Sequence, residues 1–255
     1  MGRRLGQHFL TARPLAERIA LVACPGPEPL VIEIGAGSGS LTEFLLARAA
    51  KVVAIEKDPA LAARLSEKFS SCTRLEVINA DVLSVDLGRW GPAVIVGNLP
   101  YYITSPILEK ILDLGSRLER AVILIQKEVA ERLTAAPGRR AYGFLTVRTR
   151  VFAEPEILFL VGPGAFRPPP KVDSALVRLT PVSPEQRWGI RDPAGFLQFA
   201  AWCFRQKRKT IRNNLERYYG RARLQAFSET SRRAEELSIE QLVCLYQQLG
   251  KPVLR

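Results

Sequence analysis

The sequence contains 255 residues, of which 47% are hydrophobic and 24% are charged, with 18 glycines and 18 prolines. This is the composition of a globular protein, and it excludes a collagen-like, disulfide-framework or wholly disordered chain. The 37 basic residues outnumber the 25 acidic ones and give a net charge of +12. Such an excess favours a polyanionic partner, because neutralised phosphates release their counterions on binding.

The basic excess is concentrated towards the C-terminal end. Residues 1–170 contain 21 basic and 17 acidic side chains, whereas residues 171–255 contain 16 and 8. No apolar run approaches the roughly 20 residues of a membrane-spanning helix, and no secretory signal is recognisable. The four cysteines stand singly and His8 is the one histidine, which fits a reducing cytosol and argues against a metal site. We therefore expect a cytoplasmic monomer with no metal and no membrane contact.

Strands and helices alternate through the N-terminal part of the chain, up to about position 160, beginning with a helix predicted over 12–24. Apolar runs typical of buried strands lie at 30–34, 51–56, 75–78, 93–96 and 121–125. Between them, helices are predicted at 41–49, 59–69 and 105–114. Asp58 is placed to cap the second of these helices. The alternation predicts an α/β doubly wound fold, with helices on both faces of a parallel sheet.

The pattern changes after residue 150. Two strands, at 157–161 and 175–179, flank a stiff proline-rich loop at 166–171. From residue 193 the pattern is helical to the end, with breaks near Gly220 and Thr230. We place a boundary at 181–184, which predicts a larger α/β domain over 1–184 and a small all-helical domain over 185–255.

A glycine loop follows the first predicted strand of the sheet. Glu33 lies near the end of that strand, and Gly35, Gly37 and Gly39 lead into a helix. Glycines allow positive φ angles and a close approach of ligand to backbone. A dinucleotide fingerprint would place its third glycine at position 40, which is a serine here. The loop therefore predicts either a nucleoside site that needs no pyrophosphate or simply a tight strand-to-helix turn.

Acidic residues stand at the ends of three successive strands. Glu33 ends the first, Glu56 the second, and Asp81 follows the third. An acid at the position of Glu56 can accept hydrogen bonds from ribose hydroxyls, and Asp81 could accept one from an adenine amine. Ligands of open α/β sheets bind at this carboxyl edge. Together the three favour a nucleoside lying across the edge of the sheet.

The tetrapeptide Asn98-Leu99-Pro100-Tyr101 follows the fourth strand. An amine on an aromatic base is a weak nucleophile because its lone pair is delocalised into the ring. The Asn98 carboxamide oxygen and the backbone carbonyl of Leu99 or Pro100 could accept both amine protons and free that lone pair. Tyr101 offers a face for stacking. A sulfonium methyl donor has a neutral leaving group, so in-line positioning suffices without a strong base.

Five motifs occur in an order that is specific as a set, and they span nearly the whole chain. They are Gly6-Gln7-His8-Phe9-Leu10, the run 33–42 around the glycines, Asn98-Leu99-Pro100-Tyr101, Gln126-Lys127-Glu128-Val129-Ala130 and the run 166–174 that begins Phe166-Arg167-Pro168. With these motifs the chain resembles the ribosomal RNA adenine dimethyltransferase family. The resemblance implies a Rossmann-like, S-adenosylmethionine-dependent methyltransferase sheet and, as product, S-adenosylhomocysteine.

The resemblance also implies which residues bind the cofactor: His8, Leu10, Gly35, Glu56, Asp81 and Asn98. In the family's arrangement the glycine loop passes under the methionine part, Glu56 holds the ribose and Asp81 holds the adenine. Asn98 would face both the cofactor and the target amine. Two positions depart from the common pattern, Ala36 in place of proline and His8 in place of asparagine.

For the target base, the resemblance implies that Tyr101 and Phe166 sandwich a splayed-out adenine between their rings. Stacking on aromatic side chains is the usual way in which an unstacked base is held. Together with Asn98, Leu99 and Pro100, these residues form the catalytic set that the sequence predicts.

A basic run near the C-terminus indicates how the protein would bind its RNA partner. It carries five basic residues and no acidic one over 204–212, namely Arg205, Lys207, Arg208, Lys209 and Arg212. On a helix, four of them would share a face that grips phosphates. The run resembles the C-terminal signature of the family's bacterial small-subunit branch. It implies dimethylation of two adjacent adenines near the 3′ end of 16S ribosomal RNA, within the small subunit or its precursor, as a step in subunit biogenesis.

Two other functions remain open from the sequence. A resistance-type enzyme that methylates 23S ribosomal RNA needs the same catalytic residues, so only the substrate separates it. A non-catalytic RNA-binding assembly or transcription factor could use the same fold, although the presence of Glu56, Asp81 and Asn98 argues against a site that has lost its activity.

Overall fold

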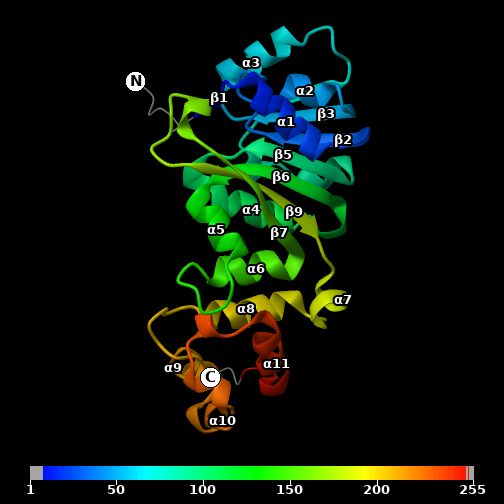
Figure 1. Ribbon diagram of the computed structural model, residues 1–255. Helices are drawn as coiled ribbons and strands as arrows, with labels where there is room; N and C mark the ends of the chain where they lie inside the picture. Colours follow the sequence, from blue (N-terminus) through cyan, green and yellow to red (C-terminus); the bar gives the residue numbers. More distant parts are fainter. Residues whose placement is uncertain (1–7, 251, 253–255) are drawn as a thin grey trace. The chain divides into compact units, whose positions relative to one another are not determined.

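The computed structural model describes residues 8–250 and residue 252. Its main sheet has seven strands in the order β4-β3-β2-β5-β6-β9-β7, and a small second sheet pairs β1 with β8 (Figure 1). The strands are β1 (Phe9–Leu10), β2 (Glu28–Ile34), β3 (Ala49–Glu56), β4 (Leu75–Asn79), β5 (Ala93–Asn98), β6 (Leu118–Gln126), β7 (Ala153–Val161), β8 (Phe166–Arg167) and β9 (Ser174–Pro181).

Helices connect these strands and make up the C-terminal part of the chain. They are α1 (Arg13–Ala23), α2 (Thr42–Leu46), α3 (Pro59–Lys68), α4 (Thr104–Leu112), α5 (Lys127–Thr134), α6 (Phe144–Phe152), α7 (Pro184–Trp188), α8 (Pro193–Cys203), α9 (Ile211–Tyr219), α10 (Arg221–Gln225) and α11 (Ile239–Leu249). Within residues 8–250, none is both long and apolar enough to cross a membrane.

The predicted α/β fold class is confirmed. Strands β2 to β6 run parallel, and β9 is antiparallel to β6. In β2, Val31 and the next residue, Ile32, are both fully buried although they point to opposite faces of the sheet. Burial on both faces explains why the strands read as continuous apolar runs rather than as alternating ones.

The strand order creates a switch point beside β2. The chain passes from β2 to its neighbour β3 and on to β4, and then returns to β5 on the other side of β2. Connections that diverge in this way leave a crevice beyond the carboxyl ends of the two central strands, which is where open α/β sheets bind their ligands. Glu33 and Asn98 stand at these two strand ends.

Local signals in the sequence position the helices well, with one difference. Asp58 caps α3 as predicted, since its side chain accepts hydrogen bonds from the backbone N–H groups of Ala60 and Leu61. The helix predicted over 41–49 is shorter and ends at Leu46. Ala49 already pairs with Glu28 in the β2–β3 ladder, so the end of the predicted helix forms the start of strand β3 instead.

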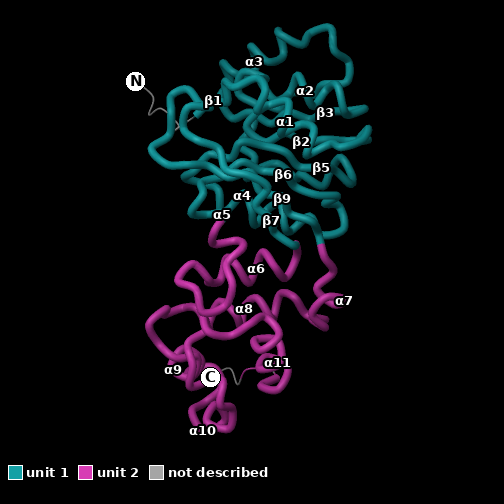
Figure 2. Tube along the Cα trace, in the orientation of Figure 1, with its two compact units in different colours: residues 1–130, 154–181 teal, residues 131–153, 182–255 magenta. Residues whose placement is uncertain are grey.

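The chain divides into two compact units (Figure 2), which differ from the division expected from sequence. Unit 1 comprises residues 1–130 and 154–181, and unit 2 comprises 131–153 and 182–255. Tyr142, Val147 and Val151 belong to the same buried cluster as Phe196 and Leu242, so segment 131–153 packs with the C-terminal helices. The apolar residues of this segment recur with the same period as those of a helix that covers the sheet. No local pattern in the sequence therefore shows that the segment belongs to unit 2.

The prediction that the basic run forms a stripe along one face of a helix is wrong. Helix α8 ends at Cys203 and α9 begins at Ile211, so most of the run lies in the connecting loop. The Thr210 side chain caps α9 by accepting a hydrogen bond from the Asn213 N–H. The buried Asn214 side chain donates to the carbonyls of Cys203 and Gln206. These bonds stabilise the loop in place of a continuous helix, and of the five basic residues only Arg212 is helical.

Candidate active site

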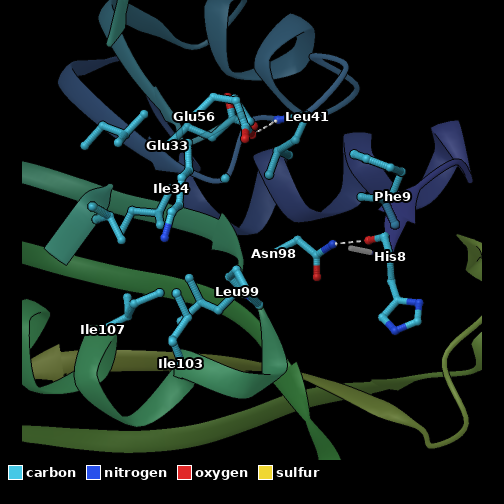
Figure 3. A pocket seen from close by; sticks show the side chains of 18 of the residues that line it. His8, Phe9, Glu33, Ile34, Leu41, Glu56, Asn98, Leu99, Ile103 and Ile107 are labelled. Carbon is cyan, nitrogen blue, oxygen red and sulfur yellow. Dashed lines mark hydrogen bonds between the residues drawn. The ribbon is translucent and has the colours of Figure 1, made fainter. Parts of the chain in front are cut away.

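A pocket opens at the switch point of unit 1 (Figure 3). It is lined from the carboxyl ends of β2, β3 and β5, from β1 and from the turn that precedes α4. Of the residues predicted for the cofactor or catalysis, all except Phe166 share this lining. They are His8, Leu10, Gly35, Glu56, Asp81, Asn98, Leu99, Pro100 and Tyr101. The structure thus brings together residues that are widely separated in sequence, from His8 to Tyr101.

The glycine loop and Glu56 are joined by hydrogen bonds. Gly37 has a φ of +55°, and its N–H donates to Glu56 Oε2 at 2.9 Å. The other carboxylate oxygen accepts the N–H of Asp58 at 2.8 Å. Glu56 is only 4% exposed, yet it lines the pocket. Its carboxylate is therefore held rigidly at the end of β3, with lone pairs left to accept from ribose hydroxyls.

Asn98 is positioned by two features, neither of which the sequence analysis identified. A Cβ on the preceding residue, Gly97, would lie 2.5 Å from the Ile34 carbonyl oxygen, so only glycine lets β5 approach β2 here. The Asn98 amide donates to the His8 carbonyl at 2.8 Å, and Figure 3 shows its Oδ1 on the other side, away from that bond. Among the described residues, none donates a hydrogen bond to this oxygen.

Tyr101 begins a single 3-10 turn, Tyr101–Ile103, and is half-buried. Its hydroxyl is 2.7 Å from Ser174 Oγ, and burial raises the pKa of the phenol, partly offset by this hydrogen bond. The ring centroids of His8 and Tyr101 lie 5.4 Å apart. The hydroxyl contact fixes the Tyr101 ring in the pocket wall, whereas the neighbouring Tyr102 is 56% exposed.

Phe166 is not where the sandwich arrangement requires it. Its ring is 1% exposed and lies in the core of unit 1 rather than in the pocket wall. The cause is the pairing of β8 with β1, which sets Phe166 opposite Leu10. The prediction that Phe166 faces the target base in this conformation is therefore corrected.

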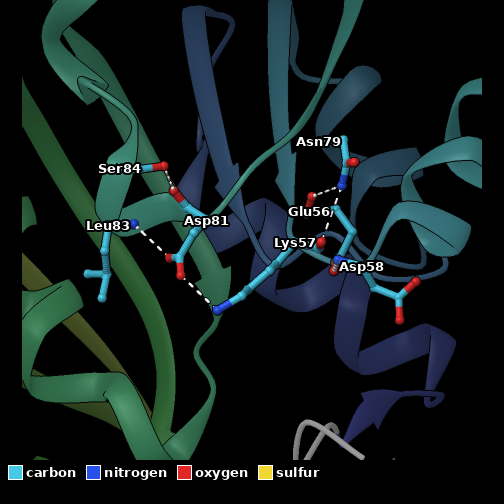
Figure 4. Close-up of polar contacts among 7 residues, drawn as sticks. All are labelled: Glu56, Lys57, Asp58, Asn79, Asp81, Leu83 and Ser84. Carbon is cyan, nitrogen blue, oxygen red and sulfur yellow. Dashed lines mark hydrogen bonds and ion pairs between the residues drawn. The ribbon is translucent and has the colours of Figure 1, made fainter. Parts of the chain in front are cut away.

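Asp81 follows the end of β4 and lines the pocket, and Figure 4 shows its polar contacts. One carboxylate oxygen accepts from Lys57 Nζ at 2.7 Å and the other from the Leu83 N–H at 3.0 Å. The hydrogen bond from Lys57, followed by the backbone bond, lowers the pKa of Asp81. Asp81 is thus a charged acceptor that is oriented before any ligand arrives.

Glu33 is the most deeply buried acid in the pocket wall, at 2% exposure. Burial raises its pKa to about 8, opposed by a hydrogen bond from Thr42 and assisted by the negative charge of Glu56. The Thr42 hydroxyl donates to Glu33 Oε2 at 2.6 Å. The sequence placed Glu33 at this edge without assigning it a separate role.

Beyond Leu10, Leu99 and Pro100, the sequence analysis assigned no role to the apolar residues of the lining. Phe9, Ile34, Leu41, Ile103 and Ile107 all contribute to the pocket. In the sequence they are indistinguishable from the core positions around them, because an apolar residue carries no mark that it faces a ligand. The one signal available was membership of the motifs, which include Phe9, Ile34 and Leu41 but not Ile103 and Ile107.

The predicted RNA-binding residues lie in unit 2 and differ in their surroundings. Arg205, Arg208 and Lys209 are exposed in the loop between α8 and α9. Lys207 donates to the Arg140 carbonyl at 2.6 Å and lies 3.7 Å from Glu235. Arg212 donates to the Thr230 hydroxyl at 3.4 Å. The first three are therefore the side chains that are freest to reach phosphates.

Four features of the site point to one class of protein. They are a crevice at the switch point of the sheet, a glycine loop without the spacing for a pyrophosphate, two oriented carboxylates and an Asn-Leu-Pro-Tyr turn. Together they define the class of S-adenosylmethionine-dependent methyltransferases. The residues fit that cofactor, since Glu56 and Asp81 present acceptors to a nucleoside. No cluster of His, Cys, Asp and Glu suited to a metal occurs among the described residues. The chain belongs to the ribosomal RNA adenine dimethylase family, whose profile matches residues 2–251. It is accordingly an enzyme that methylates adenine in ribosomal RNA.

Individual proteins and structures agree with this assignment. The chain is 41% identical over 256 residues to the ribosomal RNA small subunit methyltransferase A of Acidobacterium capsulatum, covering 96% of this chain and 90% of that protein. The protein of the same name from Thermotoga maritima is also 41% identical, with 96% and 84% covered. The crystal structure of the 23S rRNA methyltransferase ErmE superposes with a TM-score of 0.75 at 33% identity, covering 94% of this chain and 99% of that one. A dimethyladenosine transferase from Plasmodium falciparum gives 0.79 at 25% identity, with 94% and 98% covered.

Replacing Glu56 by alanine should weaken binding of S-adenosylmethionine by about 1–3 kcal/mol, the cost of leaving buried polar partners unsatisfied. Titration calorimetry measures this directly. Glu67→Ala, at an exposed position on α3, is the matched control and should leave affinity unchanged. Because Glu56 also accepts the Gly37 N–H, Glu56→Gln separates the two roles by keeping one acceptor oxygen for the loop. Full affinity in Glu56→Ala would show that the ribose lies elsewhere.

Proposed function

We propose that this protein transfers methyl groups from S-adenosylmethionine to the exocyclic amines of two adjacent adenines near the 3′ end of 16S ribosomal RNA, giving dimethyladenosine. The observation that carries the proposal is the Asn98 carboxamide. Its nitrogen is engaged by the His8 carbonyl, which leaves Oδ1 as the acceptor for a target amine. When bound, the cofactor supplies a methyl group on a positively charged sulfur.

The second acceptor for the amine is the Leu99 carbonyl. Two backbone carbonyls follow Asn98, but that of Pro100 already accepts the Ile103 N–H at 3.2 Å and the Thr104 hydroxyl at 3.1 Å. A carbonyl oxygen has two lone pairs, so Pro100 is saturated. No described residue donates to the Leu99 carbonyl, and the Leu99 N–H is fixed by the Leu124 carbonyl at 3.0 Å. Asn98 and Leu99 together would draw the amine nitrogen towards a tetrahedral geometry.

The remaining pocket residues have positioning roles in this proposal. Glu56 and Asp81 hold the ribose and adenine of the cofactor, with Gly35, His8 and Leu10 completing its contacts. Tyr101 offers one stacking face to the target base, since its hydroxyl is held by Ser174. In-line placement of amine and methyl group then supplies the rate enhancement, because two bound reactants avoid the entropy cost of meeting in solution.

The choice of RNA rests on the curated relatives and on the basic loop. The relatives cited above carry a small-subunit name and are 41% identical to this chain. ErmE, named for 23S rRNA, has the same fold at 33% identity. A 23S substrate is therefore the second candidate. We propose that the enzyme acts as a cytoplasmic monomer on the small subunit or its precursor, and that unit 2 contributes the RNA contacts.

The decisive test is transfer of labelled methyl groups to small ribosomal subunits that lack adenine dimethylation, with large subunits in parallel. Nucleoside analysis then identifies the product. Dimethyladenosine in small-subunit RNA alone supports the proposal. Label in large-subunit RNA alone would move the enzyme to the second candidate and leave the catalytic assignment standing. Absence of label from both, with cofactor bound, would overturn the substrate assignment.

Substituting Arg205, Arg208 and Lys209 together by glutamine should weaken binding to the small subunit and flatten its salt dependence. Each lost phosphate contact reduces the slope of log affinity against log salt by about 0.7–0.9. A filter-binding series at several salt concentrations measures that slope. Arg18, Arg64 and Arg89, exposed in unit 1, give a control with the same change in charge. An unchanged slope in the loop variant would place the phosphates elsewhere.

A further inference from the structure

The proline-rich loop at 166–171 carries two cations, Arg167 and Lys171, to which the proposed reaction assigns no role. Both residues are exposed. Neither side chain forms a hydrogen bond or an ion pair within the described part of the chain, and Asp173, the next acid along the chain, pairs with neither of them. Exposed cations are common on protein surfaces, so the role of this pair depends on where the loop holds them.

The loop is bonded to the wall of the pocket at both of its ends. At one end, His8 Nδ1–H donates to the Pro168 carbonyl at 2.7 Å. At the other end, Ser174 Oγ lies 2.7 Å from the hydroxyl of Tyr101. His8 and Tyr101 both line the pocket. The loop therefore runs beside the pocket from the β1 side to the Tyr101 side, and the two cations are carried between or directly next to these anchors.

The conformation of the loop is restricted before any ligand binds. Three consecutive prolines, at 168–170, each fix their own φ angle, and Pro170 is buried. In β8, Phe166 is turned into the core and the next residue, Arg167, is exposed, because successive side chains of a strand point to opposite faces. Cations on a stiff loop lose less conformational freedom on binding than cations on a mobile one.

The other cations around the pocket are already engaged. Lys57 is the one lysine or arginine of the described lining, and its ammonium is 2.7 Å from a carboxylate oxygen of Asp81. Lys110 donates to the Leu83 carbonyl at 3.1 Å. Lys68 lies 3.5 Å from two carbonyls of the glycine loop. The proline-rich loop thus offers positive charge beside the pocket that no described group neutralises.

The target nucleotide brings negative charge to this place. An adenine reaches Asn98 only when its base is turned out of the RNA strand into the pocket. The phosphates on either side of that nucleotide then stay outside the pocket, at its opening. Arginine and lysine are the side chains suited to bind them. Because the loop and the pocket both belong to unit 1, this placement is independent of unit 2 and its basic loop.

We propose that Arg167 and Lys171 bind the two phosphates that flank the target adenine, so that the unit that catalyses transfer also holds the target nucleotide. This inference rests on the proposed function, because it requires an RNA strand at this pocket. Phosphate contacts fix position and carry no base information. The pair therefore sets the location of the nucleotide, while Asn98 and Leu99 act on its amine.

The test combines a protein variant with a modified substrate. Arg167→Gln with Lys171→Gln removes both charges from the loop. Small subunits reconstituted with a synthetic 3′ segment of their RNA carry uncharged methylphosphonates at the three phosphates that flank the two adenines. Filter binding over a salt series gives the affinity and its salt dependence for each combination of protein and subunit.

The double glutamine variant should bind unmodified subunits about tenfold more weakly, as expected for the loss of two exposed ion pairs. Its slope of log affinity against log salt should be smaller by about 1.4, the value for two contacts to single-strand phosphates. Methylphosphonate subunits should bind the natural protein with a similar loss. They should cause no further loss in the variant, because the charges that the variant no longer contacts are the ones removed.

Two control variants separate charge at this loop from other effects. Arg167→Lys with Lys171→Arg preserves both charges and should retain most of the affinity. Arg64→Gln with Arg89→Gln changes exposed residues of unit 1 outside the pocket lining and should leave the salt slope unchanged. Titration calorimetry with S-adenosylmethionine should give the same affinity for all variants, which shows that the pocket is intact.

Four results would count against the inference. An unchanged salt slope in the double glutamine variant, with the natural protein methylating small subunits, would overturn it and leave the proposed function standing. A further loss when this variant binds methylphosphonate subunits would assign the two cations to other phosphates. An equal loss in the charge-preserving variant would show that charge is not what the loop contributes. Failure of the natural protein to methylate either subunit would overturn the proposed function and this inference with it.

Discussion

Replacing Asn98 by alanine is expected to lower methyl transfer by about 10²–10³-fold, the range seen when one oriented polar group is removed from a reacting centre. The carboxamide oxygen has no donor among the described residues, so its free lone pairs are available to the target amine. With alanine, only the Leu99 carbonyl would accept an amine proton. The nitrogen would then stay planar, with its lone pair delocalised into the adenine ring. Single-turnover transfer to undermethylated small subunits measures the loss.

The control for this prediction concerns the other half of the Asn98 amide. Its nitrogen donates to the His8 carbonyl, so the alanine variant also loosens β1 against the end of β5. Cofactor affinity should fall by less than tenfold and RNA affinity should be unchanged. A variant with the cofactor affinity of the natural protein and normal turnover would show that Asn98 has no part in the transfer. Loss of cofactor binding in proportion to turnover would make Asn98 a binding residue only.

The sheet was predictable because its strands are buried on both faces. Continuous runs such as 93–96 and 121–125 cannot belong to half-exposed strands, and the glycine loop marks where the first of the strands ends. Glu56 and Asp81 could be found for the same reason, since parallel strands bring their carboxyl ends to one edge. Local chemistry was also sufficient for Asp58, whose cap needs only the residues that follow it.

The parts that were missed depend on contacts distant in sequence. Phe166 is buried because β8 pairs with β1, at the opposite end of unit 1's sequence. Segment 131–153 joins unit 2 through burial against α8 and α11, which begin only at Pro193 and Ile239. The basic run leaves the helix for a more local reason, since the Asn214 side chain donates to the carbonyls of Cys203, at the end of α8, and Gln206. The first two sets of partners lie far outside the stretch of chain that fixes a local pattern, and the third is a side-chain bond that helical periodicity does not reveal.

The second large expected effect is on the stability of the fold, and it arises from the titration of Glu33. Its pKa is about 8 in the folded protein, against an ordinary value of 4.5. Between these two pH values, unfolding lets the carboxyl ionise and release a proton. The free energy of unfolding should therefore fall as pH rises from 4.5 to 8, by about 4 kcal/mol in all, and then level off. The direction is opposite to that of Asp81, whose lowered pKa stabilises the fold at higher pH.

Glu33→Gln should remove this slope and make the ligand-free protein more stable than the natural one by about 4 kcal/mol at pH 8, with little difference at pH 4.5. Glutamine keeps an acceptor for the Thr42 hydroxyl, so the packing of α2 is retained. Urea unfolding at several pH values measures the difference, and Glu67→Gln on exposed α3 controls for the loss of a surface charge. Equal slopes in the Glu33 variant and the natural protein would mean that the buried carboxyl is ionised at neutral pH even in the empty pocket. A stabilised variant that binds the donor less well would show that the acid is kept in the pocket wall for binding, at the expense of the fold.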